Sequence, residues 1–300
     1  MLIIDTHCDT LFMRALAPND TPCVTLENLR KGGVNLQTCT LFAGSRGMDG
    51  PSYENALKEL DALDALKAQG WKVVDSPFDA REGESAVMVS LEGGEILGDQ
   101  LENVAFFREK GARLIALTWN NENRIASPAK GGSKDGIKPY GWAVLREMAR
   151  LHIAADTSHL NEAGFWDLID KHVHPPMASH SCCAALRPHF RNLTDEQIRA
   201  LIARGGWIGV NFYPAFLVEE GDAHVSDIVR HIDHIVQLGG AKNVGFGSDF
   251  DGIEYTPVDC QSPADVPAIL DGLRALGYGE DAIADIAGRN FLSYFRRIDA

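Results

Sequence analysis

Eight short apolar runs, separated by amphipathic stretches, constrain the fold of this 300-residue chain more than any other feature. Most of the runs are too short to be helices, and turn residues bound them. They comprise residues 3–5, 36–42, 87–91, 114–117, 153–155, 176–178, 207–210 and 244–246. Strands that alternate with helices indicate βα units around a parallel sheet. Because α/β barrels of roughly this length form one unit, we expect residues 1–300 to be a single domain.

The stretches between the runs have the periodicity of surface helices. Apolar residues recur at spacings of three and four over residues 56–66, and again over residues 228–235. Thr194 followed by Gln197 predicts a capping box that opens a helix over residues 195–203. Eight strands favour a closed (β/α)8 TIM barrel, although a doubly wound open sheet has the same local pattern. No glycine-rich dinucleotide or phosphate-binding motif follows the first run.

Charge and composition exclude several classes of protein. The 42 acidic and 28 basic residues give a formal net charge of -14, which disfavours nucleic acid and anionic membrane surfaces as partners. The first ten residues lack a basic segment, and no apolar stretch approaches the roughly 20 residues of a membrane helix. The six cysteines form no CxxC pair, so we expect reduced thiols and a cytoplasmic location.

Residues able to bind metals recur at or just after the ends of the apolar runs. His7 and Asp9 follow the first run, Glu92 follows the third, and His159 and His180 follow the fifth and sixth. Each alone has an ordinary reading as a capping, turn or structural residue. In barrel enzymes, however, the carboxyl ends of the strands form the active-site rim. Their repeated placement therefore predicts one site, and imidazole with carboxylate suits zinc or a similar divalent ion.

This set of ligands predicts a two-metal hydrolytic centre. A hydroxide that bridges two zinc ions would act as the nucleophile, because zinc lowers the pKa of bound water to about 7. Asp249, the first acid after the eighth run, is placed to transfer a proton to the leaving group. Asp251 precedes a glycine and is assigned to a turn. His231 and His234 lie in a helical pattern without an HExxH motif, so we do not assign them as ligands.

Seven motifs occur in order along nearly the whole chain. They are Asp5-Thr6-His7-Cys8-Asp9, Leu91-Glu92-Gly93-Gly94, Leu117-Thr118-Trp119-Asn120, Ser158-His159, Ser179-His180-Ser181, Arg191-Asn192-Leu193-Thr194-Asp195 and Gly245-Phe246-Gly247-Ser248-Asp249-Phe250-Asp251-Gly252. Together they resemble the membrane (renal) dipeptidase family, the zinc peptidases of the amidohydrolase superfamily. The resemblance implies two zinc ions: one bound by His7 and Asp9, the other by His159 and His180, with Glu92 bridging both.

The resemblance also implies roles around the metals. Asp249 would be the catalytic acid and base, and Arg191 would hold the terminal carboxylate of a dipeptide, a role suited to a planar charged fork. One motif departs from the family pattern, because many members have a histidine where this chain has Trp119. Either the metal alone polarises the scissile carbonyl, or a neighbour such as Asn120 or Asn123 donates a hydrogen bond to it. Trp119 would instead narrow the side-chain pocket and alter substrate preference.

The sequence is thus interpreted as a binuclear zinc dipeptidase that tolerates a C-terminal D-residue. One alternative is another amidohydrolase reaction, such as deacylation of N-acyl amino acids or lactone opening. A second is a non-catalytic metal-binding protein, because Trp119 replaces a common catalytic histidine. The expected partners are small dipeptides and, by analogy with relatives that form dimers, a second copy of the chain.

Overall fold

The strands form a closed parallel barrel in the computed structural model, which describes residues 1–44 and 50–300. In these residues the strands are β1 (Ile3–Asp5), β2 (Val34–Leu41), β3 (Lys72–Val73), β4 (Ala86–Glu92), β5 (Ala112–Ala116), β6 (Ala154–Asp156), β7 (Met177–Ala178), β8 (Trp207–Val210) and β9 (Val244–Phe246). All strands except β3 form the ring, because β1 pairs with β9 and β2 pairs with β4 from Leu36 to Leu41. This closure confirms the barrel and excludes the open sheet.

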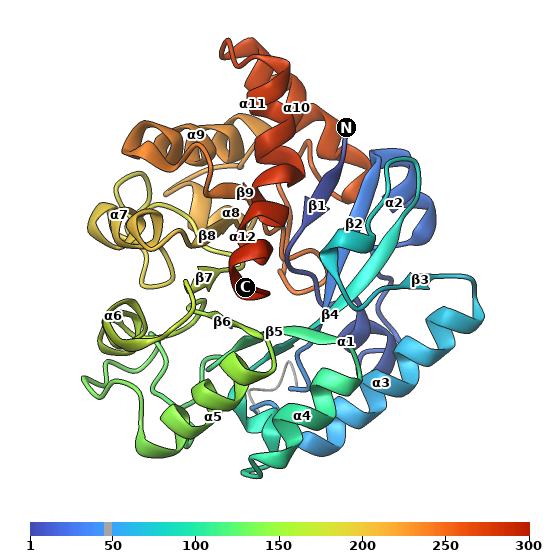
Figure 1. The fold of residues 1–300 in the computed structure, drawn as a ribbon. Coiled ribbons are helices and arrows are strands. Elements are labelled where there is room, and N and C mark those ends of the chain that lie inside the picture. Colours follow the sequence, from blue (N-terminus) through green and yellow to red (C-terminus); the bar gives the residue numbers. More distant parts are fainter. Residues whose placement is uncertain (45–49) are drawn as a thin grey trace.

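Helices surround the ring of strands (Figure 1). Within the described part of the chain they are α1 (Thr10–Ala15), α2 (Leu26–Gly32), α3 (Tyr53–Ala68), α4 (Glu102–Glu109), α5 (Pro139–Arg150), α6 (Glu162–Lys171), α7 (Asp195–Ala203), α8 (Pro214–Leu217), α9 (Val225–Ile235), α10 (Val266–Ala275), α11 (Glu280–Ala284) and α12 (Asn290–Ile298). None of these helices is long and apolar enough to cross a membrane. The predicted α7 has the expected bounds, and its capping box between Thr194 and Gln197 is present.

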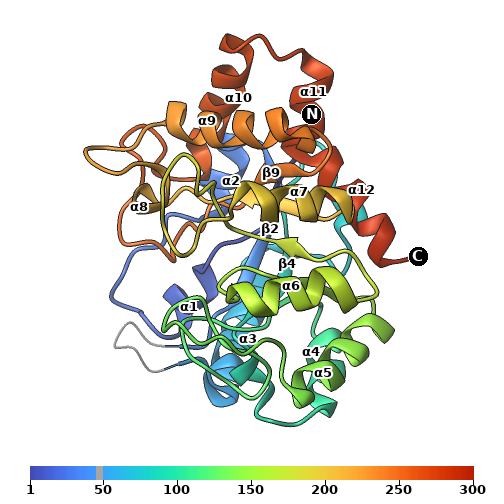
Figure 2. The ribbon, with the colours of Figure 1, turned by 90° about the vertical axis from the view of Figure 1, so that its left-hand side faces the viewer.

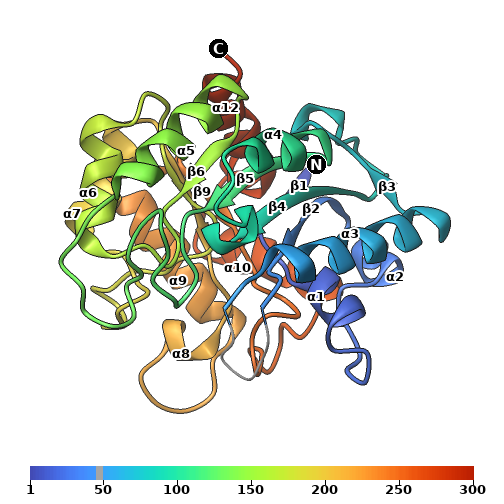
Figure 3. The same cartoon turned by 90° about the horizontal axis from the view of Figure 1, so that it is seen from below.

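Helix α12 closes one end of the barrel. Its apolar residues recur at i, i+3, i+4 and i+7, so they share one face. That face packs against inward-facing strand residues such as Ile4 and Met88, and the ring of Phe291 lies 5.2 Å from that of Trp207. Figures 2 and 3 show α12 and the C-terminus at one end of the molecule, with α1 and α8 at the other. The second end, where the strands finish, is therefore the one available for a site.

Two differences from the predicted strands have physical causes. The first difference is that β5 begins at Ala112, whereas the predicted run begins at residue 114. The strand extends further because Arg113, although charged, lies buried within it. Its guanidinium donates to the carbonyl of Asp75, pairs with Asp299 and stacks on Phe295, so burial does not leave the charge without partners. β3 escaped prediction because only Lys72 and Val73 pair, beside the start of β4.

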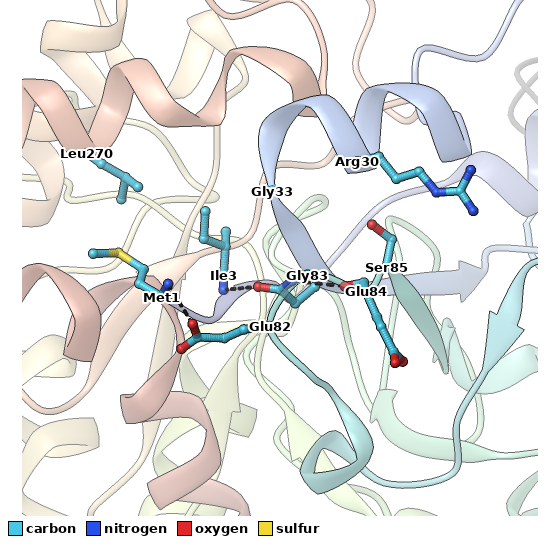
Figure 4. A pocket seen from close by; sticks show the side chains of 10 residues that line it. Met1, Ile3, Arg30, Gly33, Glu82, Gly83, Glu84, Ser85 and Leu270 are labelled. Carbon is cyan, nitrogen blue, oxygen red and sulfur yellow. Dashed lines mark hydrogen bonds and ion pairs between the residues drawn. The ribbon is translucent and has the colours of Figure 1, made fainter.

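A hollow of about 360 Å³ lies at the amino ends of β1 and β2, away from the strand ends that carry the predicted site (Figure 4). The carboxylates of Glu82 and Glu84 in its lining are paired locally. The amino group of Met1 lies 3.0 Å from Glu82, and Glu84 lies 2.7 Å from Lys72. The hollow brings together none of the predicted site residues.

Candidate metal centre and active site

The five predicted metal ligands converge at the carboxyl ends of four strands. His7 and Asp9 follow β1, Glu92 is the last residue of β4, and His159 and His180 follow β6 and β7. All five are buried, with at most 9% of any residue exposed. Strand ends that are distant in sequence meet here because every strand of the barrel runs in the same direction.

Glu92 lies at the middle of this cluster. Its Oε1 is 3.0 Å from Nε2 of His159 and 3.3 Å from Nε2 of His180. Its Oε2 is 3.8 Å from Nε2 of His7, which lies 3.5 Å from Oδ2 of Asp9. One carboxylate thus faces two histidines through one oxygen and the His7–Asp9 pair through the other. Glu95, three residues further along the chain, accepts a hydrogen bond from the side chain of Asn123.

The outward-facing nitrogens of the three histidines are fixed by polar neighbours. Nδ1 of His7 is 3.3 Å from the hydroxyl of Thr40, and Nδ1 of His180 is 2.7 Å from that of Ser179. Nδ1 of His159 lies 3.1 Å from Oδ1 of Asn120. Histidines that bind metals are generally held in this way through the second ring nitrogen. The arrangement directs each Nε2 toward Glu92.

Ionisation favours the metal-binding forms of most of these ligands. Burial, with the nearby Arg191, lowers the pKa of His159 to about 4, and burial also lowers the pKa of His180 well below its usual range. Burial opposes the charge on Glu92, but the neighbouring His159 and His7 outweigh it and hold the pKa of this carboxyl well below its usual range. Neutral imidazole and ionised carboxylate are the forms that coordinate a cation.

Several ligand atoms lack a hydrogen-bond partner among the described residues. They are Nε2 of His7, Nε2 of His180, Oδ1 of Asp9 and Oε1 of Glu92, all of them buried. A buried polar atom without a partner costs about 1–3 kcal/mol. Two groups of residues also bring their ligand atoms together, His7–Glu92–His180 and His7–Asp9–Asp249. Within each group the ligand atoms lie within 4.8 Å of one another. These residues therefore fit divalent cations, which would satisfy the buried atoms.

Asp249 lies beside the His7–Asp9 pair. Its Oδ1 is 3.7 Å from Nε2 of His7, and its Oδ2 accepts a hydrogen bond of 2.8 Å from the side chain of Asn211. Burial, together with the carboxylates of Asp9 and Glu92, raises the pKa of Asp249 to about 8, although His7 and Asn211 oppose this shift. A carboxyl with such a pKa is able to hold and release a proton near neutral pH.

Backbone strain occurs at two of these positions. His159 and Asp249 both adopt φ of 65°, in the left-handed region that L-residues seldom occupy. Each such residue costs about 1–3 kcal/mol and persists where the surrounding structure fixes it. Here the backbone N–H of Asp249 donates to the carbonyl of His7, which ties the strained residue to β1.

Arg191 is buried next to the histidine cluster. One guanidinium nitrogen donates to the carbonyl of His180 at 3.3 Å, and the group lies 5.6 Å from the ring of Phe216. Its Nε has no hydrogen-bond partner in the described chain. Burial lowers the pKa of Arg191, while Glu92 and Asp249 favour its charged form. A buried guanidinium with spare donors is suited to binding an anion.

The three residues predicted near the substrate differ in their surroundings. The ring of Trp119 lies 6.4 Å from that of His159, so this side chain borders the site. Asn120 also reaches the site, but its oxygen faces His159 and orients that ligand. The amide nitrogen of Asn123 donates to Glu95 and to the carbonyl of Leu117. Its hydrogens are therefore engaged, and the structure does not support the prediction that Asn123 polarises a substrate carbonyl.

Sequence reasoning missed Asn211 and the polar residues beneath the ligands. Asn211 is the first residue after β8, so the strand-end rule that identified the ligands would have found it. Asp156 accepts hydrogen bonds from the backbone N–H groups of Ser158 and Ser179, and its other oxygen accepts from the hydroxyl of Ser179. No sequence signal identifies this pairing, because the partners are joined only when β6 and β7 lie side by side.

We predict that Gly252→Ala weakens metal binding and turnover. A Cβ on Gly252 would lie 2.0 Å from Oδ2 of Asp9 and 2.6 Å from Oδ1 of Asp249, so both carboxylates must move. Displacement of about 1 Å at an active site costs about 100-fold in rate. The check is kcat together with bound metal by elemental analysis. Gly279→Ala is the control, because its Cβ would meet nothing within 4 Å; equal behaviour of the two variants would contradict the prediction.

Comparisons with known proteins identify the family of this chain. The model of the membrane dipeptidase family, peptidase family M19, matches residues 1–300. An uncharacterized protein in the pqqA 5′ region of Klebsiella pneumoniae is 36% identical over 229 residues, which cover 73% of this chain and 84% of that protein. An uncharacterized dipeptidase of Schizosaccharomyces pombe is 28% identical over 327 residues, covering 98% of this chain and 80% of the relative.

A solved structure has the same fold. A metallo peptidase from Rhodobacter sphaeroides, liganded with a phosphinate mimic of the dipeptide L-Ala-D-Ala, is 25% identical with a TM-score of 0.90. The superposition covers 99% of each chain. The match over all 300 residues confirms the resemblance found in the sequence motifs. The chain therefore belongs to the membrane dipeptidase family, the M19 family of metallopeptidases.

Proposed function

We propose that this protein hydrolyses dipeptides with two divalent ions, most suitably zinc, and accepts a D-residue at the C-terminal position. The observation that carries the proposal is the position of Arg191, a buried guanidinium with spare donors, beside the cluster of ligands around Glu92. A dipeptide has a carboxylate one residue from its peptide bond. The site thus combines an anion-binding group with a hydrolytic centre at a short separation.

The ligand set supports the choice of metal. His7 and Asp9 would hold one ion and His159 and His180 the other, with Glu92 shared between them. Mixed nitrogen and oxygen ligands are typical of catalytic zinc. When bound, a pair of such ions supplies Lewis acidity to polarise the peptide carbonyl and activates water as a nucleophile.

The protein's own residues would bind the substrate and move the proton. Arg191 would fix the terminal carboxylate and so place the peptide bond above Glu92. Asp249 would take up a proton at its carboxylate as water adds, and then donate it to the departing amine. The hydrogen bond from Asn211 would keep the Asp249 carboxyl oriented toward His7 during both transfers. Trp119 and Asn120 would border the substrate on the side of His159.

Acceptance of a C-terminal D-residue is part of the proposal. The Rhodobacter sphaeroides structure was solved with a mimic of L-Ala-D-Ala, and its fold matches this chain along nearly its full length. A carboxylate anchor fixes the end of the substrate without requiring one configuration at the adjacent carbon. The stereochemical preference is therefore read out by paired L,L- and L,D-substrates.

Metal binding is predicted to release protons from the metal-free cluster. Burial disfavours the imidazolium of His7, but Glu92, Asp9 and Asp249 outweigh it and raise the pKa of His7 to about 10. His7 must lose this proton to become a ligand, so metal affinity should fall about tenfold per pH unit as the pH is lowered below 10. Calorimetry at pH 7.5, in two buffers of different ionisation enthalpy, should count at least one released proton. Affinity unchanged between pH 6.5 and 8.5 would contradict this assignment.

The test of the proposed function is hydrolysis of a panel of L,L- and L,D-dipeptides by metal-stripped protein, with and without added zinc. Release of amino acids only after zinc addition is the expected result. N-acetylated amino acids form the second panel, because they too present a carboxylate to Arg191 beside a cleavable amide. Cleavage of that panel alone would replace the dipeptidase by an N-acyl amino acid deacylase. Normal metal uptake without any cleavage would favour a non-catalytic role.

Two further predictions from the sequence remain proposals. A cytoplasmic location is checked by fractionating cells that express the native gene. Pairing of two chains is checked by light scattering of the zinc-loaded protein, where the mass of two 32.7 kDa chains is expected.

A further inference from the structure

An aromatic cluster lies beside the candidate metal centre. Phe42 follows β2 and Trp119 follows β5, the two strands that pair with β4 on either side of Glu92. The rings of Phe42 and Trp119 are 4.9 Å apart in an edge-to-face arrangement, and that of Phe12 lies 5.3 Å from Phe42. Phe42 is buried, whereas Trp119 is only partly buried and borders His159. We call the Phe42–Trp119 pair the aromatic wall.

Arg191 lies on the other side of the barrel mouth. It belongs to the segment between β7 and β8 and donates to the carbonyl of His180. In the ring of strands, β8 is opposite β4, so the aromatic wall and Arg191 flank the ligands from opposing sides. A substrate held by Arg191 that extends across the metal centre would point its far end toward the wall.

A buried glutamate on α3 fixes the backbone that carries Phe42. Oε1 of Glu59 accepts a hydrogen bond of 2.8 Å from the backbone N–H of Ala43. Ala43 has φ of 58°, a left-handed conformation that disfavours alanine. The Ala43 carbonyl also accepts from the N–H of Ser52. Glu59 is fully buried, and burial raises the pKa of its carboxyl well above the usual range.

Resting on the proposed dipeptidase function, we infer that the aromatic wall selects dipeptides with a large apolar side chain on the N-terminal residue. Arg191 holds the C-terminal carboxylate, and two residues span only about 7 Å. The peptide bond then lies over Glu92, and the N-terminal side chain lies against Trp119, whose ring packs on the buried Phe42. An aromatic face buries apolar groups well but gives a glycine or an acidic side chain nothing to bind. Glu59 is a positioning residue for this wall.

The inference is tested with dipeptides that vary only at the N-terminal residue, Gly-D-Ala, Ala-D-Ala, Leu-D-Ala and Phe-D-Ala, on zinc-loaded protein. The measured quantity is the ratio of kcat/KM for Leu-D-Ala to that for Gly-D-Ala. We expect about 10-fold to 200-fold in the wild type, the range over which apolar pockets discriminate. Trp119→Ala should bring the ratio toward one. Trp166→Ala, at another partly buried tryptophan on the outer helix α6, is the matched control and should keep it.

Two variants separate positioning by Glu59 from a general effect on folding. Glu59→Gln retains an oxygen acceptor for the Ala43 N–H and should keep the wild-type ratio. Glu59→Met loses the acceptor and should lower the ratio. A purely structural defect would reduce turnover of both dipeptides equally and leave their ratio unchanged, which would overturn the role of Glu59.

Measurements of binding, which do not require hydrolysis, test the aromatic wall separately from the proposed dipeptidase activity. Inhibition or calorimetry with phosphinate mimics of Gly-D-Ala and Leu-D-Ala should show the same preference and the same loss in Trp119→Ala. A preference in binding without hydrolysis of any dipeptide would retain the wall and overturn the dipeptidase. Hydrolysis without a preference at the N-terminal residue would retain the dipeptidase and overturn the wall. A Trp119-dependent preference confined to the C-terminal residue would overturn the orientation of the substrate, and no binding at all would overturn both.

Discussion

Asp249→Asn is expected to lower kcat for dipeptide hydrolysis by about 100-fold to 10,000-fold while metal content stays at the wild-type level. The amide has the same shape as the carboxyl. Its oxygen can still accept the hydrogen bond that the side chain of Asn211 donates to Oδ2 of Asp249 in the wild type. It cannot take up or release the proton that the leaving amine requires. The loss therefore isolates proton transfer from binding, and kcat with elemental analysis measures both.

Metal content decides between two readings of this variant. Oδ1 of Asp249 lies 3.7 Å from Nε2 of His7, within a group that also includes Asp9. Loss of one metal together with turnover would make Asp249 a ligand, and retained turnover would remove it from the mechanism. Asp251→Asn is the control in the same loop, because Asp251 accepts from the N–H groups of Cys23 and Val24 and lies outside the ligand cluster. It should keep most of the turnover.

The strands of the barrel and the convergence of its ligands followed from sequence because both depend on local patterns. Apolar runs mark strands, and the residue that follows a parallel strand lies at one rim whatever the loops do. His7 and His180 are separated by 173 positions, yet their ring centroids lie 3.8 Å apart. Closure itself was not determined by these patterns, because the pairing of β2 with β4 is a contact that an open sheet would lack.

The parts that could not be predicted depend on side chains that meet only after folding. Asn123 follows the same motif as Asn120, but its amide turns inward to Glu95 and a backbone carbonyl. Glu59 reads as a solvent-facing acid between the apolar positions of α3, whereas it is fully buried against the loop at Ala43. Helical spacing alone does not show which neighbours approach a helix from the side, so it could not reveal this contact.

Arg191→Met is expected to lower kcat/KM for dipeptides by about 30-fold to 4,000-fold, which corresponds to about 2–5 kcal/mol. The physical reason is that a substrate carboxylate would enter a buried site and find no cation. The same change removes a charged group that burial destabilises, so the melting temperature of the zinc-loaded protein should rise rather than fall. A loss of activity through misfolding would instead lower both quantities.

Amidated dipeptides show whether the loss in kcat/KM comes from the interaction between Arg191 and the substrate carboxylate. The wild type should cleave a C-terminally amidated dipeptide as poorly as Arg191→Met cleaves the free acid. The variant should cleave the amidated dipeptide only slightly more slowly than it cleaves the free acid. This double-mutant logic attributes the coupling to one pair of groups. Arg187→Met, on the same loop, is the control, because its guanidinium donates to the carbonyls of Ala215 and Pro188. Independent, additive losses would mean that Arg191 acts on something other than the substrate carboxylate.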